Sequence, residues 1–223
     1  EKIVASDGAS DDYFGFSVSI SSDGSRVVVG AYNSDNANGN NAGAIYVYTL
    51  TNGTWVEEKI VASDGAAIDR FGNSVSISSD GTRVVAGAST DDNANGTDAG
   101  AIYIYTLTNG TWVEEKVTAS DGASDRFGNS VSISSDGSRV VTGAHVNDNA
   151  NGNNAGAIYI YTLTNGTWVE EKLLASDGAV GDIFGRSVAI SSDGTRVVAG
   201  SHSNGDNAGA AYIYTLTNRN WVE

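Results

Sequence analysis

The sequence of 223 residues contains no cysteine and no proline, and its only histidines are His145 and His202. Without cysteine, disulfides, zinc–thiolate sites, iron–sulfur clusters and thiol nucleophiles are excluded. With two histidines, most metallohydrolase sites and most Ser–His triads are excluded as well. Because proline is absent, the tight turns of the chain have to be made by Gly, Asn and Asp.

Positive charge is also scarce. The chain carries 12 Lys and Arg residues against 27 Asp and Glu residues, which gives a formal net charge of −15 at pH 7. Such a surface repels phosphate groups, so we expect neither nucleic acid nor an anionic membrane surface as a partner. No apolar run approaches the roughly 18 residues of a membrane-spanning helix, so membrane insertion is not expected either.

Internal repetition is the main feature that the sequence does have. The pair Phe-Gly recurs in four copies of one pattern of about 56 residues, at Phe14, Phe71, Phe127 and Phe184. The copies differ in length only in their connecting segments, which is typical of strands joined by loops. We treat 1–223 as one repeat domain, with units starting at 14, 71, 127 and 184 and the last unit completed by 1–13.

Each copy predicts four strands. In the second copy they cover 71–78, 83–88, 101–107 and 112–117, with an Asp80-Gly81 turn after the first and an Asn109-Gly110 turn after the third. Both dipeptides are typical of tight hairpins, whose turn residues adopt positive φ. No segment has the period of an amphipathic helix, so the fold class is all-β.

The third strand of each copy is apolar on both faces. In the second copy Ile102 and Ile104 point to one face, and Tyr103 and Tyr105 point to the other. A two-layer sandwich would leave one face of each sheet in water and would show polar residues there. The pattern instead favours four-stranded antiparallel blades packed face to face around an axis, which is a β-propeller.

Three segments of each copy carry a family resemblance. In the second copy they are Phe-Gly-Asn-Ser-Val-Ser-Ile-Ser from Phe71, Val-Val-Ala-Gly-Ala from Val84 and Ala-Gly-Ala-Ile-Tyr-Ile-Tyr from Ala99. These segments resemble the FG-GAP repeat, the propeller repeat of integrin α subunits and of many secreted or surface proteins of microbes. The resemblance covers the whole chain. The Ca²⁺ loop that integrin-type repeats place between their first two strands is not expected here, because the connection at 21–25 is too short and has one carboxylate.

The chain ends inside the fourth strand of the last copy. Joining Trp221-Val-Glu223 to Glu1-Lys2-Ile3 recreates the sequence Trp-Val-Glu-Glu-Lys-Ile that starts at Trp55. Three arrangements agree with this: a slice of a longer array, a closed four-bladed ring whose termini share the last strand, or half of a larger ring completed by another chain. Because the sequence begins with Glu1 and not Met, we expect an excerpt or a processed product.

The loop between the second and third strands is the candidate metal site. In the second copy Asp91, Asn93, Asn95 and Asp98 match the opening half of a D-x-N-x-N-G calcium loop. The bidentate Glu of such loops is absent, since Ile102 stands in its place, and Asn and Gly also form solvated turns without a metal. We favour the turn, expect no required cofactor, and keep weak Ca²⁺ binding as the alternative.

Acidic and basic residues recur in register. Four equivalent carboxylate pairs argue against a single active site, and we expect them to cap backbone N–H groups; they are Asp7 and Asp12, Asp64 and Asp69, Asp121 and Asp125, and Asp177 and Asp182. We expect eight basic residues to pair with nearby Glu or turn Asp and to leave no basic stripe; they are Lys2, Lys59, Lys116, Lys172, Arg26, Arg83, Arg139 and Arg196.

The remaining candidate residues are aromatic rings, imidazoles and sequons. We expect the four tryptophans to pack between neighbouring blades rather than to stack on sugar rings; they are Trp55, Trp112, Trp168 and Trp221. His145 and His202 occupy equivalent loops and are expected at the surface. Four Asn-x-Thr sequons are candidate glycosylation sites of a secreted chain, at Asn52, Asn95, Asn109 and Asn165.

These features predict a non-catalytic interaction or assembly module, outside the cell or on its surface, that acts in adhesion or protein–protein contact. Its expected partners are a protein or a glycan, and self-assembly is included. One alternative is a carbohydrate-binding propeller that uses loops or Trp faces. An enzyme with a site at the axis is the less favoured alternative, because only the two histidines break the repeat with suitable chemistry.

Overall fold

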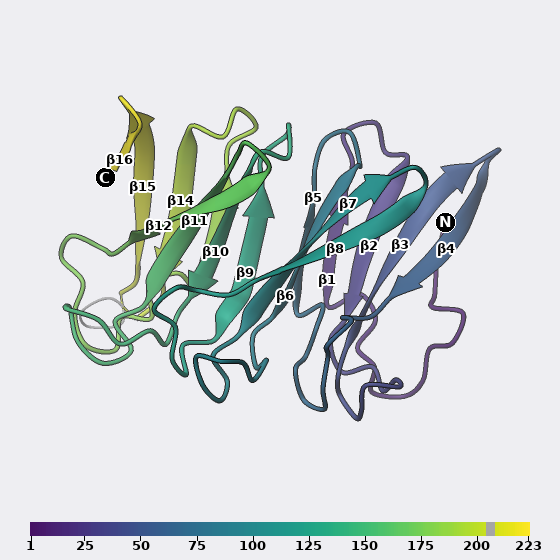
Figure 1. Ribbon diagram of the computed structural model, residues 1–223, viewed down its shortest axis with the longest axis horizontal. Coiled ribbons are helices and arrows are strands. Elements are labelled where there is room, and N and C mark those ends of the chain that lie inside the picture. The colour runs from purple at the N-terminus through teal and green to yellow at the C-terminus, as the bar shows by residue number, and fades with distance from the viewer. Residues whose placement is uncertain (204–207) are drawn as a thin grey trace.

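The computed structural model describes residues 1–203 and 208–223, and within these residues no helix is long and apolar enough to span a membrane. Figure 1 shows four antiparallel sheets standing side by side in an open row, each built from four consecutive strands. Sheet 1 contains β1 (Ser17–Ile20), β2 (Arg26–Ala31), β3 (Ala44–Thr51) and β4 (Thr54–Ile60); sheet 2 contains β5 (Ser74–Ile77), β6 (Arg83–Ala88), β7 (Ala101–Thr108) and β8 (Thr111–Val117); sheet 3 contains β9 (Phe127–Ile133), β10 (Arg139–Ala144), β11 (Ala157–Thr164) and β12 (Thr167–Leu173); sheet 4 contains β13 (Ser187–Ile190), β14 (Arg196–Ser201), β15 (Ala210–Thr217) and β16 (Asn220–Val222).

The two hairpin turns of each sheet are made differently. In sheet 2, Asn109 and Gly110 both adopt positive φ, at 51° and 80°, which is the two-residue turn that was predicted. In the other turn only Gly81 does so, and its N–H donates to the carbonyl of Ser78 at 3.0 Å. Asp80 instead accepts hydrogen bonds from Ser78 Oγ and the Thr82 N–H, so its side chain holds the turn closed.

In sheet 2 the Phe-Gly pair connects neighbouring sheets and lies before the first strand. The strand predicted for 71–78 is β5, which covers only Ser74–Ile77. Phe71 forms a parallel bridge with Gly43 of sheet 1, and its N–H donates to the carbonyl of Ala42 at 3.0 Å. Phe127 makes the same bond to Ala99, yet in sheet 3 the first strand β9 does begin at Phe127, which pairs with Ala144.

Both faces of the third strand are buried, as predicted. Ile102, Tyr103, Ile104 and Tyr105 are all 2% exposed or less. The tyrosine face of sheet 2 packs against sheet 1, and the Phe71 ring meets the Tyr103 ring edge-on with centroids 5.2 Å apart. The isoleucine face of the same strand packs against sheet 3. Three apolar cores therefore lie between two sheets, and a fourth lies between sheet 1 and the N-terminal segment that includes Ile3 and Phe14.

A glycine on the second strand allows neighbouring sheets to approach closely. A Cβ on Gly87 of sheet 2 would collide with the backbone carbonyl of Gly128 in sheet 3. That carbonyl instead accepts a hydrogen bond from Ser74 Oγ at 2.8 Å. The same contact joins Ser17 to Gly72 and Ser130 to Gly185, so all three junctions between sheets share it.

Two further polar contacts repeat at each junction. The Arg83 guanidinium donates to the carbonyl of Gly137 at 2.9 Å, and the Ile133 N–H donates to Ser76 Oγ at 3.2 Å. The predicted pairing of the in-register arginines with acidic side chains is therefore wrong for the three at the junctions. Arg26, Arg83 and Arg139 reach the turn glycine of the next sheet, because the close approach of the sheets places that carbonyl within their length.

The row of sheets is not closed into a ring. Figure 1 places the N-terminus beside sheet 1 and the C-terminus beside sheet 4, at opposite ends of the row. Residues 1–13 form no strand, and they are held against sheet 1 by Tyr48, whose hydroxyl donates to the carbonyl of Val4 at 3.1 Å. Residues 1–13 lie before sheet 1 in the same way as residues 61–70 lie before sheet 2. At the other end of the row, β16 pairs only with β15 among the described residues.

Candidate functional site

The candidate metal residue Asp91 is a buried ion-pair partner. Its side chain is 1% exposed, and one carboxylate oxygen accepts hydrogen bonds from Lys116 Nζ at 2.7 Å and from the Tyr103 hydroxyl at 3.1 Å. The other oxygen accepts from Asn93 Nδ2 at 3.0 Å. The carboxylate is thus neutralised by a lysine and held by the protein itself.

The other three candidate ligands stabilise their own loop. Asn93 Oδ1 accepts from the Asn95 N–H, while Asn95 Nδ2 donates to the carbonyl of Ala119 at 2.7 Å. Asp98 adopts a positive φ of 51°, and its N–H donates to Asp92 at 2.8 Å. Among the described residues, no three His, Cys, Asp or Glu side chains converge in a way that could hold a metal. These contacts support the turn interpretation of the loop.

From this network we expect Ca²⁺ to leave the stability unchanged. A site with millimolar Ca²⁺ at 100 times its dissociation constant would stabilise the fold by about 2.7 kcal/mol. We therefore predict that the melting temperature in EDTA and in millimolar Ca²⁺ agrees within about 1 °C, as measured by calorimetry. A saturable rise with Ca²⁺ that Asp91→Asn removes would instead make this loop a calcium site.

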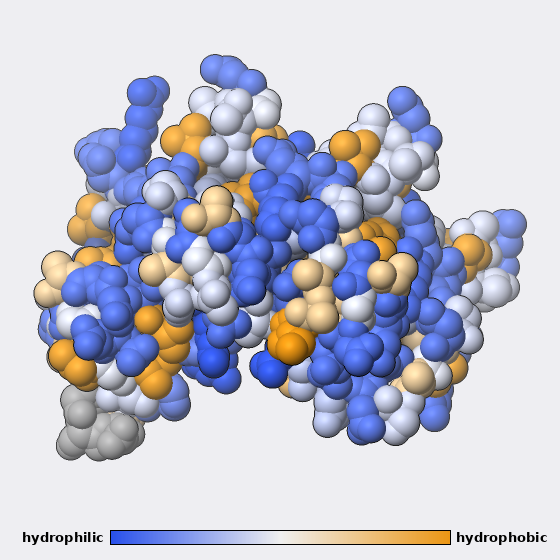
Figure 2. Space-filling view, turned by 60° about the horizontal axis from the view of Figure 1, so that its bottom comes forward, coloured by the Kyte–Doolittle hydropathy of each residue, from blue (hydrophilic) through white to orange (hydrophobic). Residues whose placement is uncertain are grey.

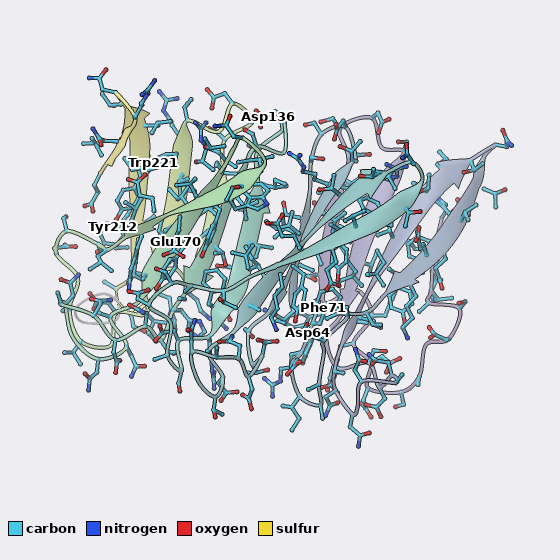
Figure 3. All side chains as sticks on the ribbon, in the orientation of Figure 1. Asp64, Phe71, Asp136, Glu170, Tyr212 and Trp221 are labelled. Carbon is cyan, nitrogen blue, oxygen red and sulfur yellow. The ribbon has the colours of Figure 1, made fainter. Side chains whose placement is uncertain are left out.

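The first acidic residue of each loop pair ties the loop to the sheet that follows. Asp64 accepts hydrogen bonds from Lys116 Nζ at 2.7 Å and from the Tyr103 hydroxyl at 2.8 Å, and Figure 3 shows it near Phe71, where the chain enters sheet 2. Burial alone would raise the pKa of Asp64, but these two hydrogen bonds outweigh it and lower the pKa below its usual value. Asp7 and Asp121 have the same partners in sheets 1 and 3.

The second acidic residue of each pair caps backbone N–H groups, as predicted, whereas that prediction is wrong for the first, which binds side chains of the following sheet instead. Asp69 accepts from the Ala66 N–H at 2.6 Å, and Asp12, Asp125 and Asp182 make the equivalent contact. Burial raises the pKa of Asp69 to about 6. These contacts hold the loop backbone in place.

The tryptophans and sequons are placed largely as the sequence suggests. Trp112 is partly buried against the core between sheets 1 and 2, with the Arg26 guanidinium 5.7 Å from its ring centroid. Packing between blades is thus confirmed for Trp112, and likewise for Trp168 and Trp221, whereas among the described residues Trp55 packs only against sheet 1 and the segment before it. The sequon residues Asn52, Asn109 and Asn165 are exposed on hairpin turns. At Asn95 the glycan-accepting Nδ2 is already used in the bond to Ala119.

A cationic cavity of about 220 Å³ lies where the first strands of the sheets begin. We call it the axial pocket and define it by Arg70, Arg126, Arg186, His145 and the Phe16–Tyr32 pair, all of which line it. Figure 2 brings this end of the molecule forward and shows an indentation between the two halves of the row. Three of the four arginines outside the repeat register line this cavity, a local basic cluster that the expectation of no basic stripe did not include.

His145 is buried at this pocket and not at the surface, which corrects a second expectation. Its side chain is 7% exposed, and among the described residues its Nδ1 atom has no hydrogen-bond partner. Burial, together with the positive charges of Arg186 and Arg126, lowers the pKa of His145 to about 4, so the ring is neutral at pH 7. His202 of the last copy is exposed, as expected.

The two ends of the row expose apolar faces that are buried everywhere else. On sheet 4, Val198 and Ile213 are 39% and 60% exposed, whereas their counterparts Val141 and Ile160 in sheet 3 are fully buried. We call this the rear face and define it by Ser187, Arg196, Val198, Gly200 and Ile213. On sheet 1, Val18 and Ile20 are 65% and 60% exposed, and they define the front face. Each end thus presents half of an intersheet junction.

Comparison with known proteins identifies the family of the repeat. A family model described as FG-GAP repeat matches residues 1–48, 55–105, 112–161 and 168–214. No curated protein matches the chain.

Solved propellers share the arrangement of the sheets. U3-55K aligns with a TM-score of 0.58 and 12% identity over 96% of this chain and 52% of its own. The β-propeller domain of Cps50 (Swd1) from Myceliophteria thermophila aligns with a TM-score of 0.57 and 11% identity over 90% and 53%. The WD40 repeats of RRP9 align with a TM-score of 0.54 and 12% identity over 92% of this chain and 52% of their own. The chain thus spans about half the length of these structures, and the likeness shows the propeller fold.

Proposed function

This chain belongs to the FG-GAP repeat family, and on that premise we propose that it is a non-catalytic protein-interaction module outside the cell or on its surface, where it acts in adhesion or assembly. FG-GAP propeller repeats suggest a protein-interaction module, and the extracellular setting follows from where such repeats typically occur. We propose that the module holds a partner by adding a further FG-GAP sheet to its rear face, in the manner of its internal junctions.

The observation that carries this proposal is that the rear face keeps the residues of a junction. Gly200 corresponds to Gly87, whose missing Cβ makes room for the carbonyl of the next sheet, yet no sheet lies against Gly200. Ser187 and Arg196 correspond to Ser74 and Arg83, which donate to that next sheet. One contact is missing, because Ala189 stands where Ser76 accepts a hydrogen bond.

The front face is the complementary half, so a second copy of this chain is the occupant that we propose. Val18 and Ile20 have the positions of Val75 and Ile77, which are 8% and 7% exposed inside the junction of sheets 1 and 2. Burying such apolar area stabilises a contact by roughly 25 cal/mol per Å². Front-to-rear contact is heterologous, so it closes into a ring or extends as a filament.

Sedimentation velocity at rising protein concentration tests this assignment. We expect the wild-type chain to associate, and Gly200→Ala or Ile213→Lys to remain monomeric with unchanged circular dichroism. Val113→Lys is the matched control, because Val113 is also exposed, at 54%, but lies on the outer strand β8. A wild-type chain that stays monomeric up to its solubility limit, or association that Gly200→Ala leaves intact, would remove the proposal.

The alternatives receive less support from the geometry. A carbohydrate site on Trp faces needs exposed rings, whereas the tryptophans are partly buried against the cores. An enzyme at the axis needs an activated group, and His145 has no hydrogen-bonded hydroxyl or carboxylate at Nδ1 to form a triad. We therefore place the interaction module ahead of both alternatives.

A further inference from the structure

The axial pocket concentrates positive charge in a strongly acidic protein. The chain carries a net charge of −15, yet the residues that line this pocket include three arginines and neither Asp nor Glu. By contrast, Lys59, Lys116 and Lys172 are all paired with carboxylates. In the described part of the chain, no carboxylate forms an ion pair with Arg70, Arg126 or Arg186. The guanidinium groups are thus available to a ligand.

The fold itself brings these arginines together. Arg70 and Arg126 both precede a Phe-Gly pair and have positive φ values of 57° and 55°, because each N–H donates to the loop of the preceding sheet. Arg186 follows the Phe-Gly pair of sheet 4, and its Nη1 donates to Asn129 Oδ1 at 2.7 Å. The three side chains therefore come from three neighbouring sheets and are fixed at their backbones.

A buried group without a partner points to a ligand in the same place. The Nδ1 atom of His145 makes no hydrogen bond, although the side chain is 93% buried and lines the pocket. Buried polar atoms are nearly always hydrogen-bonded, and an exception needs a physical reason. A polar ligand atom that completes this hydrogen bond supplies one.

The opposite wall of the pocket is aromatic. Phe16 packs edge-on against Tyr32 with ring centroids 4.5 Å apart, and Tyr32 stacks on Tyr13 at 5.4 Å. Phe16 is 61% exposed, so this wall offers apolar area. The pocket thus combines hydrogen-bond donors for an oxyanion with an apolar surface for the ligand groups beside that oxyanion.

We propose that the axial pocket binds a peptide segment of a partner protein through one carboxylate side chain, with flanking apolar residues on Phe16 and Tyr32. Guanidinium groups match a carboxylate with paired N–H donors. A polyanion, such as a nucleic acid or a sulfated polysaccharide, is disfavoured because the net charge of −15 repels it at longer range. A single carboxylate in an uncharged segment avoids most of that repulsion.

Calorimetric titration with capped Phe-Glu-Phe tests the proposal. The titration is to be made with the Gly200→Ala variant, so that self-association at the rear face does not contribute to the measured heat. It is then to be repeated with the wild-type chain. The matched peptide is capped Phe-Gln-Phe, which keeps the shape and removes the charge. We expect the Gln peptide to bind at least about tenfold more weakly, since charge-assisted hydrogen bonds are the stronger class.

Variants of the chain locate the site. Arg126→Gln and Arg70→Gln are expected to weaken binding of the Glu peptide at least about tenfold, whereas Arg219→Gln, outside the pocket, leaves it within about twofold. The Nδ1 resonance of His145 should also shift on peptide addition. This inference takes only the protein nature of the partner from the proposed function, and the sedimentation test can fail without affecting it.

Three outcomes would overturn the assignment. They are equal binding of the Glu and Gln peptides, no loss with the arginine variants, and no measurable binding at all. A fourth is competition by inorganic phosphate or sulfate that matches the peptide mole for mole, because the pocket would then be a site for small oxyanions and not for a peptide.

Discussion

Replacing Gly87 by alanine is expected to lower the free energy of unfolding by about 3 kcal/mol, and the melting temperature by about 6–12 °C. The new Cβ would collide with the carbonyl of Gly128, which is backbone and cannot rotate away. Sheets 2 and 3 would have to separate, which weakens the bond from Ser74 and the apolar core between them. Thermal and urea unfolding followed by circular dichroism measure both quantities.

Gly200→Ala is the matched control for this prediction. Gly200 has the same place on sheet 4, but the nearest atom to its added Cβ is the Ser187 hydroxyl, which can rotate. Alanine also restricts the unfolded chain, so we expect a change between zero and a stabilisation of about 1 kcal/mol. Equal losses for the two variants would show that the glycine serves strand geometry and not the junction.

Replacing Lys116 by methionine is expected to cost about 3–5 kcal/mol, the range found when one partner of a buried ion pair is removed. The ammonium group lies 2.7 Å from both Asp64 and Asp91, and Asp91 is 1% exposed. Methionine keeps the aliphatic stem but leaves the Asp91 carboxylate charged and buried. The loss is read from urea unfolding at pH 7.

Lys59→Met provides the comparison within the same molecule. Lys59 makes the equivalent 2.7 Å pair with Asp7 and lies 5.2 Å from the Tyr46 ring, but Ser34 stands where sheet 2 has Asp91. Because Asp7 is half exposed, we expect a loss below about 1 kcal/mol.

A rescue variant separates the buried charge from other effects of the lysine. Adding Asp91→Asn to Lys116→Met should recover most of the free energy of unfolding that Lys116→Met loses, since the third copy already has Asn147 at the position of Asp91. If Lys116→Met and Lys59→Met cost the same, the buried carboxylate is not what makes this pair important.

The sequence was sufficient for the repeats and for most of the sheet layout. The alternation of Ile102 and Tyr103 makes both faces of one strand apolar. This local pattern predicts that a further sheet packs on each side of the strand. The spacing of Asn109-Gly110 likewise located a hairpin. The first strand of the second copy was predicted too long, since β5 begins only at Ser74, whereas β9 of the third copy does begin at Phe127. The bond from each of these Phe residues to the loop of the previous copy is a contact that no local pattern encodes.

Aligning the copies shows which residues depart from the repeat, but not that they meet in the axial pocket. Arg70 and Arg126 share one register position, whereas Arg186 occupies another on the far side of the Phe-Gly pair. Only the packing of the sheets shows that both positions face one cavity. The burial of His145 was missed for the same reason, since its counterpart His202 is exposed. A residue that differs among near-identical copies is the signal that could have pointed here.

The likeness of the three junctions has a consequence for biosynthesis. Each sheet offers its neighbour nearly the same set of groups, so surface complementarity alone does not tell the nascent polypeptide which copy comes next. We expect the correct packing order of the sheets to depend on the short connections between copies. During synthesis they let each sheet reach the next sheet in the sequence before later copies have emerged from the ribosome. Lengthening one connection with a flexible insert would therefore favour scrambled pairing between copies, and between neighbouring nascent chains, over loss of the individual sheets.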